Sequence, residues 1–154
     1  MARGDANGGP TVTAEADPPL RRPVPVEEPW SAAYWAGARE RELRISHCEA
    51  CDWYIHPPQP VCPSCLGGRL TPVRVSGRGR VYGFSVMHLP GVPGFEPPFA
   101  VAVVELDEQP GLLTVGNVLH CDPADIVVGM PVEVTFEALD DAVTLPQWQP
   151  AGRE

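Results

Sequence analysis

Four cysteines, arranged as two Cys-x-x-Cys pairs, place the strongest constraint on how this chain folds. The pairs are Cys48 with Cys51 and Cys62 with Cys65, and ten residues separate them. Each Cys-x-x-Cys turn directs two sulfurs to one side of a tight loop, so two turns facing each other across a hairpin supply four tetrahedral thiolates. In a reducing cytosol, paired cysteines are more typical of metal ligands than of disulfides. The pattern predicts a zinc ribbon, with iron in the same cage as the alternative.

Four thiolates fill the coordination sphere of zinc, so we expect a structural site with no open position for water or substrate. The position after each pair favours a residue that tolerates positive φ, and Asp52 and Leu66 stand there. A thioredoxin-type redox site needs a strand-to-helix setting, which neither pair has. Cys121 lies apart from both pairs and is interpreted as a half-buried free thiol, with a catalytic nucleophile as the alternative.

Composition and periodicity divide the chain into four segments. Residues 1–29 contain six prolines and no apolar periodicity, which predicts a disordered tail. Residues 30–42 are rich in helix formers and predict a short aromatic helix. Residues 43–75 form the zinc ribbon, in which LRISH, WYIH and LTPVRV are short strand candidates. Residues 76–150 are predicted to form a second, β-rich domain.

The predicted helix carries an aromatic stripe. Ser31 is its expected N-cap, and Trp30 and Tyr34 share one face because they lie four residues apart, with Trp35 beside them. Two roles remain open for these rings. They either pack on the body of the protein or anchor a partner, since Trp and Tyr are favoured at interfaces.

Five β-rich runs follow the ribbon, at residues 80–88, 99–106, 111–118, 131–138 and 142–148. Asp122, Pro123 and Asp125 predict a short helical turn between the third and fourth runs. Five strands with one short helix at this place are typical of an OB-fold barrel. A five-stranded sandwich or an SH3-like barrel is the alternative.

The charge distribution disfavours nucleic acid as a partner. The formal net charge is -9, and residues 81–152 contain no arginine or lysine. The second and third β-rich runs offer one aromatic ring, Phe99, for base stacking. Arg78 and Arg80 belong to a small arginine cluster just before these runs. They are interpreted either as a solvated surface or as contacts to an anionic group, such as a cofactor phosphate.

The sequence offers no recognisable catalytic unit. Its four histidines, at positions 47, 56, 88 and 120, lack a catalytic spacing to carboxylates, and no phosphate loop or nucleophile elbow occurs. No apolar run reaches the roughly 18 residues of a membrane span, and the first residues do not resemble a signal peptide. We therefore expect a cytoplasmic binding or assembly module rather than a self-sufficient enzyme.

The motifs in combination resemble a known family. The aromatic helix is followed by the two cysteine pairs and then by SGRGRVYGFSVMH, PPFAVAVVELDEQPGLLT, DPADIVVGMPVEVTFE and LPQWQP. This order resembles the zinc-ribbon and OB-fold proteins associated with acyl-CoA metabolism, over about residues 29–150. The resemblance implies a mainly β chain with a short N-terminal helix, a rubredoxin-like zinc ribbon and a five-stranded OB-fold barrel.

The same resemblance implies a function. Such proteins work as non-catalytic partners of thiolase-like enzymes, including steroid side-chain aldolases, and some assemble with MaoC-like enoyl-CoA hydratases. It implies structural zinc on the four paired cysteines, docking through Trp30, Tyr34 and Trp35, and acyl-CoA near the partner interface. We therefore expect a hetero-oligomer in which this subunit activates its enzyme and helps form the acyl-CoA channel. The alternatives are an independent acyl-CoA or lipid binding protein and, less consistent with the charges, a nucleic-acid binding module.

Overall fold

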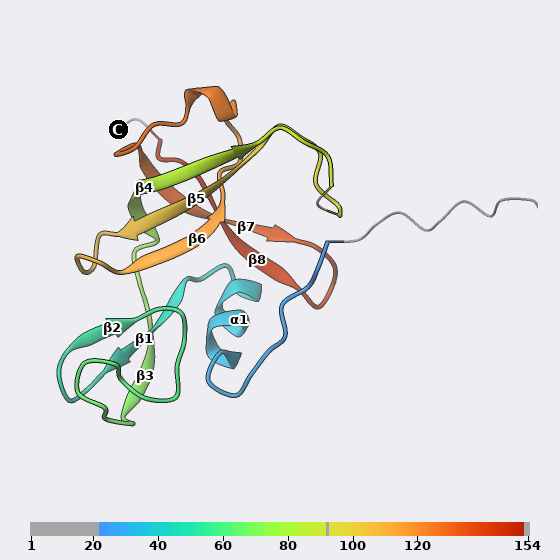
Figure 1. The fold of residues 1–154 in the computed structure, drawn as a ribbon. Coiled ribbons are helices and arrows are strands. Elements are labelled where there is room, and N and C mark those ends of the chain that lie inside the picture. Colours follow the sequence, from blue (N-terminus) through green and yellow to red (C-terminus); the bar gives the residue numbers. More distant parts are fainter. Residues whose placement is uncertain (1–21, 92, 153–154) are drawn as a thin grey trace, which may run out of the picture.

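A computed structural model describes residues 22–91 and 93–152, and it confirms the mainly β architecture (Figure 1). The predicted disordered tail lies outside the described residues up to position 21. In chain order the elements are α1 (Ala32–Arg39), β1 (Arg44–Cys48), β2 (Trp53–Ile55), β3 (Leu70–Arg74), β4 (Arg78–Met87), β5 (Phe99–Leu106), β6 (Leu113–Asn117), the 3₁₀ turn η1 (Pro123–Asp125), β7 (Pro131–Ala138) and β8 (Thr144–Pro150).

The zinc-ribbon region is a three-stranded antiparallel sheet in the order β2-β1-β3. The central strand β1 exposes its two faces to different surroundings. Ile45 is fully buried against the barrel, whereas Cys48 belongs to a separate small cluster with Ile55 and Cys62. The ribbon is therefore attached to the barrel by shared apolar packing, and the cysteines lie at its far end.

The second sheet has five antiparallel strands in the order β6-β5-β4-β7-β8. Its two edge strands approach each other through a parallel bridge between Val118 and Trp148, where the Leu119 N–H donates to the Trp148 carbonyl at 2.7 Å. The side chain of Gln147 completes the seam, because its Oε1 accepts from the backbone N–H of Asn117 at 2.6 Å and its Nε2 donates to Asn117 Oδ1 at 3.3 Å. The sheet is thus a nearly closed five-stranded barrel with the predicted OB strand order.

Strict alternation along β5 builds the barrel core. Ala100, Ala102, Val104 and Leu106 are each at most 2% exposed, as expected for residues that all point to one face of a strand. Trp148 of β8, at 1% exposure, fills the interior opposite them. Gly116 of β6 leaves room for the indole, because a side chain there would begin 3.0 Å from Trp148 Cδ1.

The helix α1 packs against β1 and β8, between ribbon and barrel (Figure 1). It is shorter than predicted, because Arg41 has a φ of 60° and the Glu42 N–H turns back to the Gly37 carbonyl at 2.8 Å. Ser31 is the N-cap residue, but its side chain accepts from the Glu28 N–H instead of capping the helix. In the described part of the chain, no helix is both long and apolar enough to span a membrane.

The predicted turn before β7 is present as η1. Asp122 is its N-cap, and its carboxylate accepts from the Ala124 N–H at 2.9 Å, with Pro123 at the first position. This confirms the short helical turn that Asp122, Pro123 and Asp125 predict. The prediction succeeds because capping signals depend only on residues that are neighbours in sequence.

Candidate metal centre and docking surface

The four paired cysteines converge at the end of the ribbon. Their Sγ atoms all lie within 4.8 Å of one another. The Sγ atoms of Cys48 and Cys65 are 3.6 Å apart, and those of Cys51 and Cys62 are also 3.6 Å apart. A tetrahedral zinc ion with Zn–S bonds of about 2.3 Å places its sulfurs about 3.8 Å apart. The cluster therefore fits one structural metal ion held by four thiolates.

Both cysteine turns have the backbone geometry that such a site needs. Asp52 has a φ of 58° and Leu66 a φ of 60°, so both positions adopt the left-handed conformation. Their N–H groups donate to Cys48 O and Cys62 O, each at 2.9 Å. Asp tolerates this conformation, whereas Leu is strained by about 1–2 kcal/mol. The Asp52 carboxylate also lies 2.8 Å from His47 Nε2, which ties the first turn to β1.

The surroundings of the thiols shift their acidity in opposite directions. The backbone N–H of Ala50 is the main cause that lowers the pKa of Cys48 to about 7. Burial, followed by the neighbouring Cys62 thiol, raises the pKa of Cys51 to about 12. The Cys48 thiolate thus forms readily, whereas Cys51 loses its proton only to the positive charge of a metal. Metal binding is therefore coupled to proton release.

Cys121 does not join this cluster. It packs half-buried against the barrel core, beside η1. Burial raises the pKa of its thiol, and the carboxylates of Asp125 and Asp122 raise it further. A thiol held protonated in this way is a poor nucleophile, which favours the interpretation as a free structural thiol.

The predicted aromatic stripe divides between interior and surface. Tyr34 packs against the barrel core, its ring centroid lies 5.2 Å from that of His56, and burial raises its pKa to about 12. Trp30 is 42% exposed in the turn before α1, and Trp35 packs edge-on against Tyr34. Tyr34 thus packs on the protein itself, while Trp30 is left exposed and available for docking.

The ribbon adds exposed apolar side chains that the sequence did not mark as docking residues. Trp53 is 43% exposed, Val61 44% and Leu66 77%, and all three lie beside the cysteine pairs. For Val61 and Leu66 the signal that could have found them is a large apolar residue in a loop, where small or polar residues are usual. We refer to Trp53, Val61 and Leu66 as the ribbon-tip patch.

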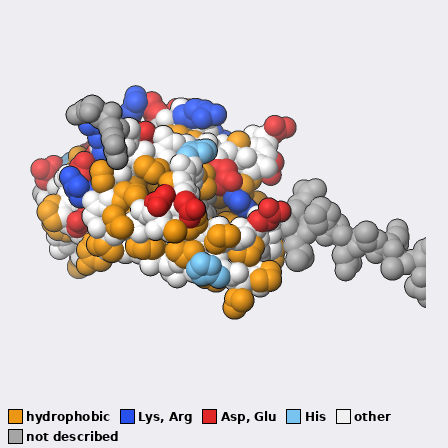
Figure 2. Space-filling model, turned by 90° about the horizontal axis from the view of Figure 1, so that it is seen from above, with side chains coloured by type: hydrophobic (Ala, Val, Ile, Leu, Met, Phe, Trp, Pro, Cys, Tyr) orange, Lys and Arg blue, Asp and Glu red, His pale blue; other side chains and the backbone are white. Residues whose placement is uncertain are grey.

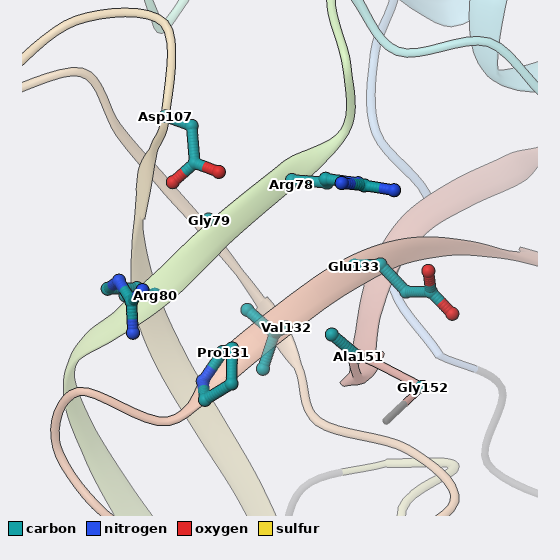
Figure 3. Close-up of a pocket in the computed structure, with 9 residues that line it drawn as sticks. All are labelled: Arg78, Gly79, Arg80, Asp107, Pro131, Val132, Glu133, Ala151 and Gly152. Carbon is teal, nitrogen blue, oxygen red and sulfur yellow. The ribbon is translucent and has the colours of Figure 1, made fainter. Parts of the chain in front are cut away.

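Arg78 and Arg80 line a surface pocket of about 340 Å³ beside the β4–β7 pairing (Figure 3). The Arg80 guanidinium donates to the Gly129 carbonyl at 3.3 Å. Asp107 and Glu133 line the same pocket, so its two positive charges face two negative ones. The balance of charge makes this a mixed polar site rather than a strongly cationic one.

Comparisons with known proteins identify both parts of the chain. Residues 35–71 match the family model "ChsH2, rubredoxin-like zinc ribbon domain", and residues 72–137 match "ChsH2, C-terminal OB-fold domain". Among solved structures, the "Ltp2-ChsH2(DUF35) aldolase" contains a chain that is 38% identical, with a TM-score of 0.76. The match covers 82% of this chain and 98% of that one.

Curated relatives point to acyl-CoA enzymes. A "Probable enoyl-CoA hydratase alpha subunit" of Thermomonospora curvata is 38% identical over 92% of this chain and 44% of its own length. The "3-oxo-4,17-pregnadiene-20-carboxyl-CoA hydratase alpha subunit" of Mycobacterium tuberculosis is 38% identical over 78% of this chain and 37% of its own length. "Benzoylsuccinyl-CoA thiolase subunit BbsA" of Thauera aromatica is 31% identical over 48% of this chain and 51% of its own length. The chain thus spans less than half of each hydratase subunit.

Proposed function

Because this chain belongs to the ChsH2 family of zinc-ribbon and OB-fold proteins, we propose that it is a non-catalytic accessory subunit of a thiolase-like acyl-CoA enzyme. The observation that carries the proposal is its match to nearly the whole of one chain of an aldolase assembly. The likeness to a thiolase subunit supports the same enzyme class. The partner would be a thiolase or a retro-aldol steroid side-chain aldolase, which this subunit binds and activates.

We propose structural zinc as the metal of the ribbon, held by Cys48, Cys51, Cys62 and Cys65. Zinc would cross-link two turns whose own apolar cluster is small, and so supply stability that a core of this size lacks. It would hold the ribbon-tip patch rigid without touching substrate. A preorganised surface loses less entropy on binding, which is an advantage for a docking platform.

Docking would use Trp30 and Trp35 together with the ribbon-tip patch. Exposed Trp side chains are favoured interface anchors, because they bury much apolar area with few rotatable bonds. Trp30 lies in the turn before α1 and Trp35 lies on α1, which packs against β1 of the ribbon and β8 of the barrel. Tyr34, the third predicted docking residue, would support this surface from beneath.

Acyl-CoA would lie in a channel shared with the partner. The pocket at Arg78 and Arg80 is small beside a whole acyl-CoA molecule, so this chain is suited to hold one end of it at most. We propose that these two guanidiniums contact a phosphate, since neither forms an ion pair within the described ranges. Arg78→Ala with Arg80→Ala is then expected to raise the KM of the complex for acyl-CoA with little change in kcat.

The deciding experiment is affinity purification of the tagged chain from its native lysate, with mass spectrometry of the recovered proteins. The recovered enzyme is then purified alone and assayed with and without this chain. Stoichiometric recovery of a thiolase-like enzyme that is inactive or insoluble alone is the expected result. A partner enzyme that is fully active without this chain would contradict the proposal. Recovery of a lone chain that binds acyl-CoA would favour an independent binding protein instead.

A further inference from the structure

The segment that precedes α1 lies against the barrel as an extended strap. Residues 22–29 lie outside the helices and strands, and they include prolines at positions 23, 25 and 29, which favour an extended backbone. The segment runs from the β4–β5 loop past the β7–β8 hairpin to α1 (Figure 1). Pro25 lines a small cavity of about 20 Å³ together with Val143 of that hairpin. We call residues 22–29 the strap.

Arg22 holds the first end of the strap through three contacts. Its Nε donates to the Gly94 carbonyl at 2.9 Å, and its Nη1 donates to Glu137 Oε1 at 2.7 Å. Its Cζ lies 4.2 Å from the centroid of the Phe95 ring, in a cation–π arrangement. A side chain at Gly94 would begin 2.6 Å from Arg22 Cγ, so glycine permits this close approach. One guanidinium therefore joins the β4–β5 loop to β7.

Both groups that hold Arg22 are themselves fixed to the barrel. Phe95 stacks on Phe99, the first residue of β5, with ring centroids 4.7 Å apart. Glu137 Oε2 accepts from Gln147 Nε2 at 3.0 Å, and Gln147 is 3% exposed on β8. The position of Arg22 thus determines whether the loop that carries Phe95 is tied to the β7–β8 side of the barrel. We call the arrangement in which Arg22 contacts both Phe95 and Glu137 the closed clasp.

The second end of the strap is tied to α1. Glu27 forms an ion pair with Arg39 in the last turn of the helix. The Glu28 N–H donates to Ser31 Oγ at 2.9 Å, and the Ser31 N–H donates to the Glu28 carbonyl, also at 2.9 Å. Trp30, the exposed ring of the proposed docking surface, lies within this turn. The strap therefore connects the docking end of α1 directly to the clasp.

The contacts of the strap are individually weak. The side chains of its two ion pairs are between 25% and 43% exposed, and solvent screens such pairs. Figure 2 shows charged side chains of both signs among hydrophobic ones on the face of the molecule seen from above. Val24 is 54% exposed and Val26 83%, so the middle of the strap buries little apolar area. Closure of the clasp therefore depends on how well the other end of the strap is held, because a fixed end raises the effective concentration of Arg22 at its site.

We propose that the strap couples docking at α1 to the position of the β4–β5 loop, with Arg22 as the residue that opens and closes the clasp. The coupling to docking rests on the proposed function, since it takes Trp30 as a docking residue. A partner enzyme bound at Trp30 immobilises one end of the strap, which lowers the entropy cost of holding Arg22 at the other end. Docking thereby favours the closed clasp and fixes the loop that carries Phe95.

Fluorine NMR of the full chain tests the coupling within the molecule. All four phenylalanines are replaced by 4-fluorophenylalanine, and Phe95→Leu assigns the Phe95 signal. Glu137→Gln opens the clasp directly and gives the direction in which this signal moves. Glu27→Ala breaks only the ion pair at α1 and should move the signal in the same direction, by at least about a third as much. Arg74→Gln removes an exposed ion pair with Glu42 in the ribbon and should leave the signal unchanged. Thermal melting checks that each variant is folded.

Affinity for the enzyme recovered from the lysate gives the second readout. Coupling is reciprocal, so Glu137→Gln, on β7 rather than α1, should weaken binding about threefold to tenfold, and Arg74→Gln should not. A Phe95 signal that Glu27→Ala leaves in place would overturn the strap and leave the accessory-subunit role standing. A signal that moves while Glu137→Gln binds with full affinity would overturn the coupling to docking. Recovery of no enzyme would overturn the proposed function and the coupling to docking together.

Discussion

His56 is a half-buried side chain with a buried, unpaired nitrogen. Its Nδ1 finds no hydrogen-bond partner within the described ranges, and its ring packs beside that of Tyr34. Burial lowers the pKa of His56 to about 4, whereas the pKa of a histidine in an unfolded chain is about 6.5. The unfolded chain therefore takes up a proton in a pH range where the folded chain does not. Stability is lost as the pH falls from about 6.5 towards 4.

This predicts that His56→Phe makes folding less sensitive to acid. Between pH 7 and pH 5.5 the wild-type chain should lose about 1 kcal/mol more unfolding free energy than the variant. Urea unfolding at the two pH values measures the difference, and the comparison cancels acid effects common to both chains. His88→Phe, at an exposed position, is the control. Equal losses in wild type and His56→Phe would contradict the assignment.

Substitution of one metal ligand should remove the metal. Cys48→Ser is expected to lower the zinc content from about one ion per chain to near zero, because three thiolates bind far more weakly than four. Metal analysis measures the content, and proteolysis reports unfolding of the ribbon. Cys121→Ser, which changes the one cysteine outside the cluster, should retain its metal. A Cys48→Ser chain with full zinc content and an intact ribbon would refute the four-thiolate site.

Sequence alone predicted the residues whose roles depend on near neighbours. The cysteine spacing located the metal cluster, and the positive φ at Asp52 and Leu66 followed from their place after each pair. The burial of Tyr34 did not follow in this way. It depends on packing against the barrel core and the ring of His56, which are distant in sequence and meet only in the folded chain.

At the level of elements, one glutamine joins barrel and ribbon. Gln109, in the turn between β5 and β6, accepts from the Tyr54 N–H at 2.9 Å and donates to the Tyr54 carbonyl at 3.2 Å. Tyr54 lies on β2, the edge strand of the ribbon sheet, so the amide of Gln109 pairs with a strand edge as a neighbouring strand would. Gln109 is 9% exposed, which makes its loss costly.

Gln109→Ala should therefore lower the unfolding free energy by about 1–3 kcal/mol, because two backbone groups of Tyr54 lose their partners. Urea unfolding measures the loss, and amide exchange at Tyr54 should accelerate before the barrel amides do. Gln149→Ala removes a more exposed side-chain bond to Glu133 and should cost less than about 0.5 kcal/mol. Equal costs for the two variants would contradict a specific role for Gln109.

The aromatic residues near α1 should separate binding from stability. Trp30→Ala is expected to weaken binding to the partner enzyme at least about tenfold and to leave the melting temperature nearly unchanged, since the ring is 42% exposed. Tyr34→Ala should instead destabilise the chain by about 3 kcal/mol, because it leaves a cavity against the core. Binding and melting measurements on both variants check this. A Trp30→Ala chain with full affinity would remove Trp30 from the docking surface.

Strand order was predictable because each strand has its own alternating pattern and turn signals. The residues at which helices and strands end were less predictable. The helix stops at Arg39 because the chain reverses at Arg41, a position where a non-glycine residue adopts positive φ without a local signal. The contact of Gln109 with β2 was not predictable either, since nothing in the turn sequence indicates that the edge of the ribbon sheet lies next to this turn.

Over the whole molecule, ribbon and barrel share one core. Leu43, Ile45 and Val75 flank or belong to the ribbon sheet, yet they lie in the same buried cluster as Val104 and Trp148 of the barrel. The cluster around the cysteines is separate and much smaller. Loss of the metal therefore first releases the small cluster, and through β1 and β3 it also weakens one side of the barrel core.

Metal removal should consequently destabilise the barrel as well as the ribbon. After chelation, amide exchange at Ala102 and Val104 of β5 is expected to accelerate at least about tenfold, because the core loses the ordered β1 side chain of Ile45. The same measurement on Cys48→Ser should give the same acceleration, which excludes a direct effect of the chelator. If the β5 amides keep their full protection while the ribbon amides exchange freely, the two parts fold independently and the shared core contributes little to their coupling.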